Sequence, residues 1–225
     1  LRVQEILVDD LDLADSLARV ARTLRNARAR TLPASELARM QDARLRTMLD
    51  HAVRHSPFYR DRLAGLDPRT CALDSIPILT RQEFGAEFDR IATDPEVRSG
   101  DVRAFMSDLG NTTRLYRGKY AVCHTSGSQG SPVTIVTDLH GRQVFYSLQV
   151  ARGRRGGNLL AEILRSVTTP FRLAVIGMAR GFFPSNAVWQ HIPENAQRFF
   201  DVRRFSPTAP DLVAQLNAFR PHALT

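Results

Sequence analysis

Residues 120–137 read YAVCHTSGSQGSPVTIVT, and this stretch decides how the chain is interpreted. Two short runs of β-forming residues, 120–123 and 133–137, flank a segment dense in glycine and hydroxyl side chains. Two such runs around a glycine-containing loop are typical of a β-hairpin. We therefore expect residues 125–132 to form the tip of a hairpin.

The composition of this tip points to an oxyanion ligand. Gly127 and Gly130 accept the positive φ angles that let consecutive backbone N–H groups face an anion, and four hydroxyl side chains add donors. A polyphosphate fits such a loop, although a serine- and glycine-rich turn without any ligand is an alternative interpretation. A Walker loop is excluded because no lysine follows Gly130, and the GxGxxG pattern is absent.

After the hairpin, predicted strands alternate with predicted helices, which favours an α/β fold. The apolar run at 173–177 is typical of a buried strand. The expected elements are a helix after Asp138, a strand over 173–177, a strand over 199–202 and a helix after Asp211. Another strand would begin after Pro221, so we expect the chain to be a fragment bounded at both ends.

Before the hairpin, the patterns are mostly helical. Apolar residues recur at spacings of three and four from Leu7 to Leu24, which predicts an amphipathic helix that ends by Pro33. Ser35 is expected to cap a second helix that ends at 55–57, with Leu45, Met48, Leu49, Ala52 and Val53 on its inner face. Residues 80–83 form a capping box for a third helix, and 94–110 is expected to be irregular with some strand. We expect a helix-rich segment over 1–115 and an α/β segment over 116–225, both within one truncated domain.

Length and composition exclude several classes of protein. The chain has 225 residues, of which 43% are apolar and 24% charged, so it can bury a core without a disulfide or metal. Its longest apolar runs are far shorter than a membrane span, and no membrane partner is expected. Cys71 and Cys123 are too few for a disulfide framework. A cytoplasmic location is expected.

The net charge of +8 is compatible with an anionic partner but does not identify one. Together with the arginine- and glycine-rich stretch 152–157, it supports a basic nucleic-acid-binding module as an alternative function. A solvated loop explains the same stretch. His51 and His55 lie four residues apart, but no third ligand is near them in the sequence, so no metal site is predicted.

Thr125 to Pro132 resembles the phosphate-binding loop of adenylate-forming enzymes, [ST]-S-G-[ST]-T-G-x-P, with Gln129 where threonine is more common. The flanking sequence is similar to the phenylacetate-CoA ligase branch of that superfamily. The similar segments are His55 to Arg60, Ile76 to Thr80, Asp138-Leu139 and the closing Leu212 to Leu224, which contains Leu216 to Pro221. The resemblance spans about residues 45–225.

The resemblance implies that the chain is the incomplete front part of the large domain of such an enzyme. The implied reaction is ATP-dependent activation of a carboxylic acid, first of all an aryl acid, to an acyl-adenylate, followed by transfer to a thiol such as coenzyme A. ATP, Mg²⁺ and coenzyme A are the implied cofactors, and a small-molecule carboxylate is the implied partner. A nucleic-acid partner is not expected, and a homodimer is one open alternative for the assembly. The implied β- and γ-phosphate contacts are Thr125, Ser126, Gly127, Ser128, Gln129 and Gly130.

The resemblance also sets limits. The catalytic and adenine-binding motifs of the superfamily are expected beyond Thr225, so catalytic residues stay unknown and this chain alone is expected to be inactive. The branch often has lysine where Ser131 stands, so Lys119 or a nearby arginine would have to compensate. A catalytically degenerate, ligase-like binding protein is therefore a further alternative.

Two other features are candidates for substrate contacts. Phe182 and Phe183 follow the predicted strand at 173–177 and could line an acyl pocket, or they could belong to the core. His124 precedes the loop and could contact the substrate or phosphate, or it could be structural.

Overall fold

The computed structural model describes residues 13–127, 132–153, 169–177, 181–184, 187, 189, 191–192 and 200–224. The fold is mixed α/β. Its contacts divide the chain into two compact units, of which one comprises Leu1–Arg30, Leu109–Cys123 and Val136–Thr225 and the other comprises Thr31–Asp108 and His124–Ile135. We call them the sheet unit and the helical unit. Each draws on residues from both sides of position 115, so the units do not coincide with the two expected segments.

The helical unit begins with α2 (Ala34–His55). Pro33 precedes its first residue and its carbonyl accepts the N–H groups of Glu36 and Leu37, which puts Ser35 inside the first turn. The prediction that Ser35 caps this helix is therefore wrong, because proline with its fixed φ takes the preceding position. Leu49 is buried, as its place on the predicted inner face requires, but Met48 is 60% exposed.

Ser56 forms a fully buried junction between α2 and α3 (Pro57–Arg62). Its extended backbone ends α2, as expected for a residue before proline. Its hydroxyl accepts the N–H of Tyr59 at 3.3 Å, which caps α3, and donates to the carbonyl of Arg90 at 2.9 Å. One residue thus ends a helix with its backbone, begins the next with its hydroxyl, and joins this junction to α5 (Phe88–Ile91).

The other helices of this unit are the 3₁₀ helix η1 (Leu73–Ser75), α4 (Arg81–Ala86) and α6 (Ser99–Ser107). Thr80 caps α4 as predicted, since its hydroxyl accepts the Glu83 N–H at 3.2 Å. The prediction of an irregular segment with strand over 94–110 is wrong, because α6 lies within it. Asp89 accepts the N–H of Ser99 at 2.6 Å and so supplies a helix-start contact from ten residues upstream. Val102 of α6 is fully buried.

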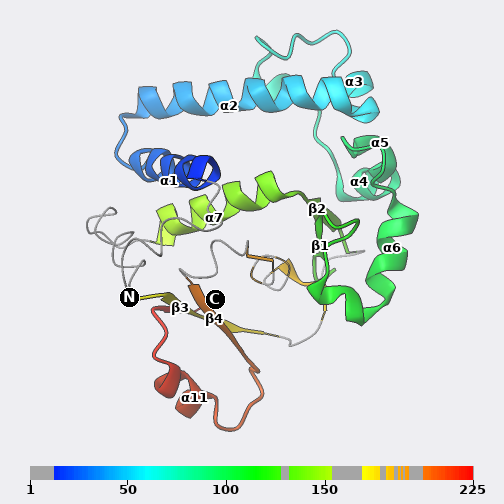
Figure 1. The fold of residues 1–225 in the computed structure, drawn as a ribbon. Coiled ribbons are helices and arrows are strands. Elements are labelled where there is room, and N and C mark those ends of the chain that lie inside the picture. The colour runs from blue at the N-terminus through cyan, green and yellow to red at the C-terminus, as the bar shows by residue number, and fades with distance from the viewer. Residues whose placement is uncertain are drawn as a thin grey trace. The chain divides into compact units, whose positions relative to one another are not determined.

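In the sheet unit, α1 (Leu13–Arg28) packs along α7 (Leu139–Gly153) (Figure 1). Asp138 caps α7 as predicted, with its carboxylate 2.7 Å from the Gly141 nitrogen. Three contacts join residues that are 121 positions apart, so the two helices run parallel with a constant register. They are Arg22 to Gln143, Asn26 to Ser147 and Arg30 to the carbonyl of Ala151.

The described contacts of α1 with α7 are polar, contrary to expectation. Asn26 and Ser147 are both buried and hydrogen-bonded at 2.9 Å, whereas Leu24, predicted to face inward, is 38% exposed. Ala18 and Ala21 are exposed as well. The physical reason is that the surface offered by α7 here is itself polar, so α1 turns its hydrogen-bonding side to it.

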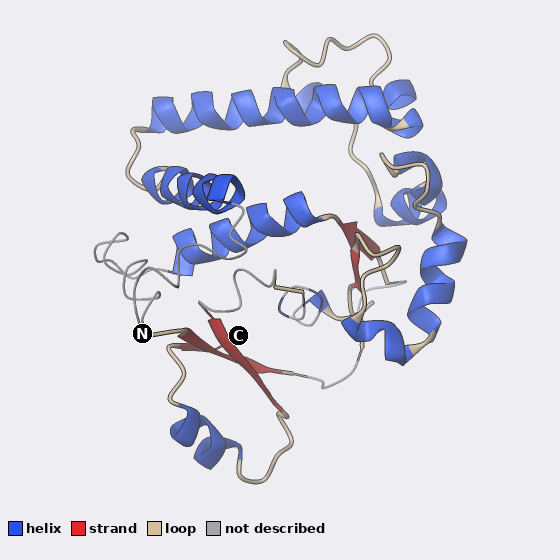
Figure 2. Cartoon of the chain, viewed as in Figure 1, coloured by secondary structure: helices blue, strands red, loops and turns tan. Residues whose placement is uncertain are grey.

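Other described elements of the sheet unit are the 3₁₀ helix η2 (Leu109–Thr113), a small parallel sheet and a helix beside that sheet (Figure 2). The strands β3 (Phe171–Ile176), β4 (Phe200–Phe205) and β5 (Ala223–Leu224) pair in parallel in the order β4-β3-β5. The helix α11 (Leu212–Phe219) packs through Leu212, Leu216 and Phe219 against Ala174 and Phe205. Strands near 173–177 and 200–202, a helix after Asp211 and a strand after Pro221 are thus confirmed; Phe199 lies outside the described residues.

Within the described part of the chain, no helix has both the length and the apolar character needed to cross a membrane. Cys71 and Cys123 are both free thiols, and burial raises the pKa of Cys123 to about 11.

Replacing Ser56 with alanine is expected to lower the free energy of unfolding by about 2 kcal/mol, because it removes a helix cap and leaves the Arg90 carbonyl without its donor. Urea denaturation of the variant measures this loss. Ser35→Ala serves as the control, since Ser35 is exposed and caps nothing. Equal stabilities of the two variants would contradict this role of Ser56.

Candidate functional site

The hairpin predicted from the sequence is present. Strands β1 (Ala121–His124) and β2 (Thr134–Thr137) pair in a two-stranded sheet. At the loop end of this sheet, the Thr125 N–H donates to the Val133 carbonyl at 3.0 Å, and the Val133 N–H donates to the Thr125 hydroxyl at 3.0 Å. The two bonds close the base of the loop, so residues 126–132 form its tip.

Three of the six predicted phosphate contacts belong to the described residues. These are Thr125, Ser126 and Gly127, while Ser128, Gln129 and Gly130 lie outside, as does Ser131. Gly127 has a φ of 68°, a left-handed conformation that glycine adopts at little cost. Ser126 is exposed. The first part of the tip therefore contains a left-handed turn at Gly127.

His124, at the end of β1, is oriented by the backbone of the loop. Its Nδ1 lies 2.9 Å from the carbonyl oxygen of Thr125, and because a carbonyl only accepts, Nδ1 carries the proton. The ring is half-buried. This contact is consistent with a structural role for His124 at the base of the loop.

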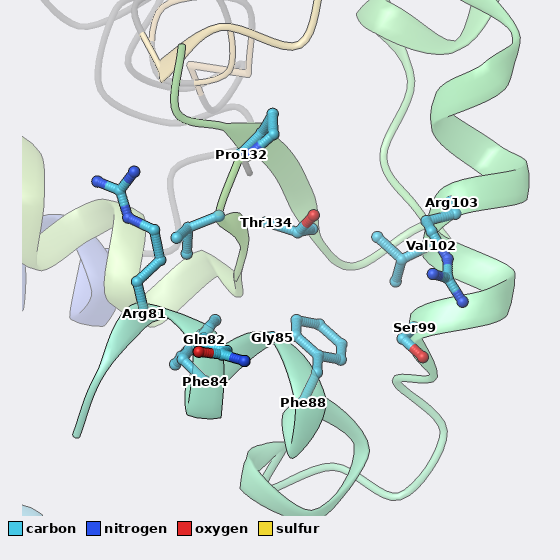
Figure 3. Close-up of a pocket in the computed structure, with 11 residues that line it drawn as sticks. Arg81, Gln82, Phe84, Gly85, Phe88, Ser99, Val102, Arg103, Pro132 and Thr134 are labelled. Atoms are coloured by element: carbon cyan, nitrogen blue, oxygen red, sulfur yellow. The ribbon is translucent and has the colours of Figure 1, made fainter. Parts of the chain in front are cut away.

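A cavity of about 680 Å³ lies beside the C-terminal side of the tip, within the helical unit. Pro132, Val133 and Thr134 form one wall, and the start of α4 together with α5 and α6 forms the others (Figure 3). The apolar part of the lining comes from residues that also belong to the packed interior of this unit. The full lining is Arg81, Gln82, Phe84, Gly85, Phe88, Ser99, Val102, Arg103, Pro132, Val133 and Thr134.

The charged groups on this cavity are cationic. Arg81 and Arg103 lie on opposite sides of it in Figure 3, with Pro132 and Thr134 between them. Among the described residues that line it there is no carboxylate. Arg103 also acts on Asp89, whose pKa is lowered first by the Ser99 N–H and to a smaller extent by Arg98 and Arg103. Both arginines are exposed and line the cavity.

Sequence reasoning singled out neither arginine. Arg81 directly follows the Thr80 cap and begins α4, so the capping box places it, but only the tertiary fold brings it to the hairpin. Arg103 lies in the segment that was predicted to be irregular. Lys119, the other suggested cation, belongs to the sheet unit.

The other sequence candidates are only partly described. Phe182 is 5% exposed and Phe183 is half-buried, while 178–180 and 185–186 lie outside the described residues. The rings of His51 and His55 have centroids 4.5 Å apart, and the described residues contain no group of three or more metal-ligating side chains. Of the basic stretch 152–157, residues 154–157 lie outside the described part.

The sequence matches no protein-family model, and a comparison with curated proteins finds no match.

Thr125→Val is expected to loosen the loop base, because valine keeps the shape of threonine but does not accept the Val133 N–H. One lost hydrogen bond of about 1 kcal/mol corresponds to an exchange rate about fivefold faster at that amide. Hydrogen exchange followed by NMR measures it. Thr125→Ser keeps the hydroxyl and should keep the protection; unchanged protection in Thr125→Val would show that the bond does not hold the base.

Proposed function

We propose that this chain supplies the phosphate-binding part of an adenylate-forming ligase that activates a carboxylic acid with ATP and passes the acyl group to a thiol such as coenzyme A. The observation that carries the proposal is the closed hairpin base, with Gly127 in a left-handed turn and the cavity with Arg81 and Arg103 beside it. The sequence resemblance of residues 125–132 to the phosphate loop of these enzymes supports it.

The described groups fit the triphosphate of ATP. A glycine turn presents N–H groups to an oxyanion, and two guanidinium groups offset its charge. Arginine at the rim of the cavity compensates for serine instead of lysine at position 131, since a guanidinium binds phosphate oxygens at least as well as an ammonium does. The apolar lining, which includes Phe84, Phe88 and Val133, limits the water that competes for these contacts.

The part of this chain in the reaction is to bind and orient. When the pyrophosphate group leaves, negative charge shifts toward the β- and γ-phosphates, where donors fixed in advance stabilise the transition state. Mg²⁺ supplies further charge neutralisation when bound, and it enters such sites largely on the phosphates and water, so the absence of a carboxylate from the described cavity lining is compatible with it. The aryl nature of the acid and the thiol acceptor rest on the resemblance alone.

Gly127→Val is expected to abolish binding of Mg·ATP, because valine at a positive φ distorts the tip and its side chain occupies the space of the oxyanion. Isothermal titration calorimetry measures the binding. Gly65→Val is the matched control, since Gly65 has a φ of 84° and open space around it, so the strain is similar but distant from the tip in sequence. ATP binding by Gly127→Val at the unaltered affinity would refute the role of the loop.

Arg81→Gln and Arg103→Gln are each expected to weaken ATP binding by about fivefold, which corresponds to about 1 kcal/mol for an exposed charge-assisted contact. AMP lacks the β- and γ-phosphates, so its affinity should not change. Arg39→Gln on α2 removes the same charge from an exposed position outside the cavity lining and controls for net charge. Equal losses for ATP and AMP would contradict contacts to the phosphate tail.

In the full natural chain, exchange of labelled pyrophosphate into ATP should occur only when the accepted carboxylate is present. Aromatic acids are the first to test. Exchange that is independent of any acid would exclude acyl-adenylate formation, while ATP binding without exchange would favour a ligase-like binding protein.

A further inference from the structure

Arg142 on α7 has an unusual environment for an arginine. The residue is only 6% exposed, and within the described structure its Nε and Nη1 atoms are buried without a hydrogen-bond partner. A buried charge without a partner is costly, because it loses its hydration and gains nothing in exchange. Such a group favours binding of an anionic partner, which the described residues do not provide.

The groups that influence Arg142 do not neutralise it. Asp138 is the acidic one among them, but it is exposed and its Oδ1 accepts the Gly141 N–H at the start of α7. The pKa of His191 is lowered to about 4, first by burial and then by the positive charges of Arg142 and of Arg204 on β4. A neutral imidazole and two guanidinium groups therefore share one region of the sheet unit.

Aromatic side chains border this region. Tyr146 lies one turn after Arg142 on α7, and its ring centroid is 5.7 Å from that of Trp189 at an interplanar angle of 42°. Burial raises the pKa of Tyr146 to about 12, so its phenol stays protonated and remains a hydrogen-bond donor. Trp189 is half-buried and is the only tryptophan of the chain, so its fluorescence reports on this region.

We propose that Arg142 is the centre of an oxyanion-binding site, in which its guanidinium binds a carboxylate or phosphate group of a small ligand beside Arg204, His191 and the Tyr146–Trp189 ring pair. A bound oxyanion supplies the acceptors that Nε and Nη1 lack and offsets the charge that burial makes costly. The site does not rest on the proposed function, because it belongs to the sheet unit and shares no residue with the hairpin-tip cavity.

The test is a fluorescence titration of the wild-type chain with inorganic phosphate and, separately, with benzoate. A saturable change in Trp189 emission with phosphate alone identifies a phosphate-type site, a change with benzoate alone identifies a carboxylate site, and a change with both identifies a general oxyanion site. Arg142→Gln should weaken the response at least tenfold. Arg203→Gln should leave it unchanged, because Arg203 is exposed and pairs with Asp201.

Thermal unfolding in buffer without oxyanions separates binding from a structural role. If Arg142 serves to bind a ligand, Arg142→Gln should be at least as stable as the wild type without oxyanions, because the substitution removes an uncompensated buried charge. Phosphate or benzoate should then raise the Tm of the wild type but not of the variant. The proposal is overturned if neither anion changes the fluorescence or Tm of the wild type, or if Arg142→Gln responds as the wild type does. Lower stability of Arg142→Gln without oxyanions would likewise overturn it, by showing that the guanidinium already has a structural partner.

Discussion

The two hydrogen bonds between Thr125 and Val133 determine where the strands end and the loop begins. The second of them uses the threonine hydroxyl, so a side chain rather than the next carbonyl accepts the Val133 N–H. At Val133 the backbone N–H therefore pairs with a side chain instead of continuing the backbone ladder. The same two bonds fix Pro132 to Thr134 as one wall of the cavity, so the tip and the cavity share a single anchor.

Arginine is abundant in this chain, and its structural uses explain part of that abundance. Arg46 reaches the carbonyl of Cys71, Arg62 pairs with Glu83, and Arg172 donates to the carbonyl of Arg220. In each case a forked guanidinium joins segments far apart in the sequence. These arginines stabilise turns and helix ends. In contrast, Arg81 and Arg103 line the cavity, and two side-chain nitrogens of Arg142 have no hydrogen-bond partner in the described structure. Position in the fold, rather than net charge, separates the two groups.

Local signals predicted the elements that depend on neighbouring residues. Thr80, Asp138 and the apolar run of β3 each act within a few positions of the chain, and each predicted its element correctly. The Ser35 cap failed locally, because Pro33 takes the cap position of α2. The other two failures involve distant partners, since Asp89 supplies the contact that begins α6 and α7 decides which side of α1 is covered. The cavity also escaped sequence analysis, because its walls come from residues between 81 and 134 that only folding brings together. For the tip itself, the glycine content predicted a turn residue at Gly127, which has a positive φ, while phosphate binding by Thr125 to Gly130 stays a prediction.

The polar seam between α1 and α7 has a thermodynamic consequence. Its described contacts are an amide with a hydroxyl, a guanidinium with an amide, and a guanidinium with a carbonyl. Hydration of apolar surface raises the heat capacity of an opened state, while hydration of polar surface lowers it. Separation of α1 from α7 would therefore have a small heat-capacity increment, and a calorimetric scan would register the melting of the β3–α11 core far more strongly than the release of the first helix.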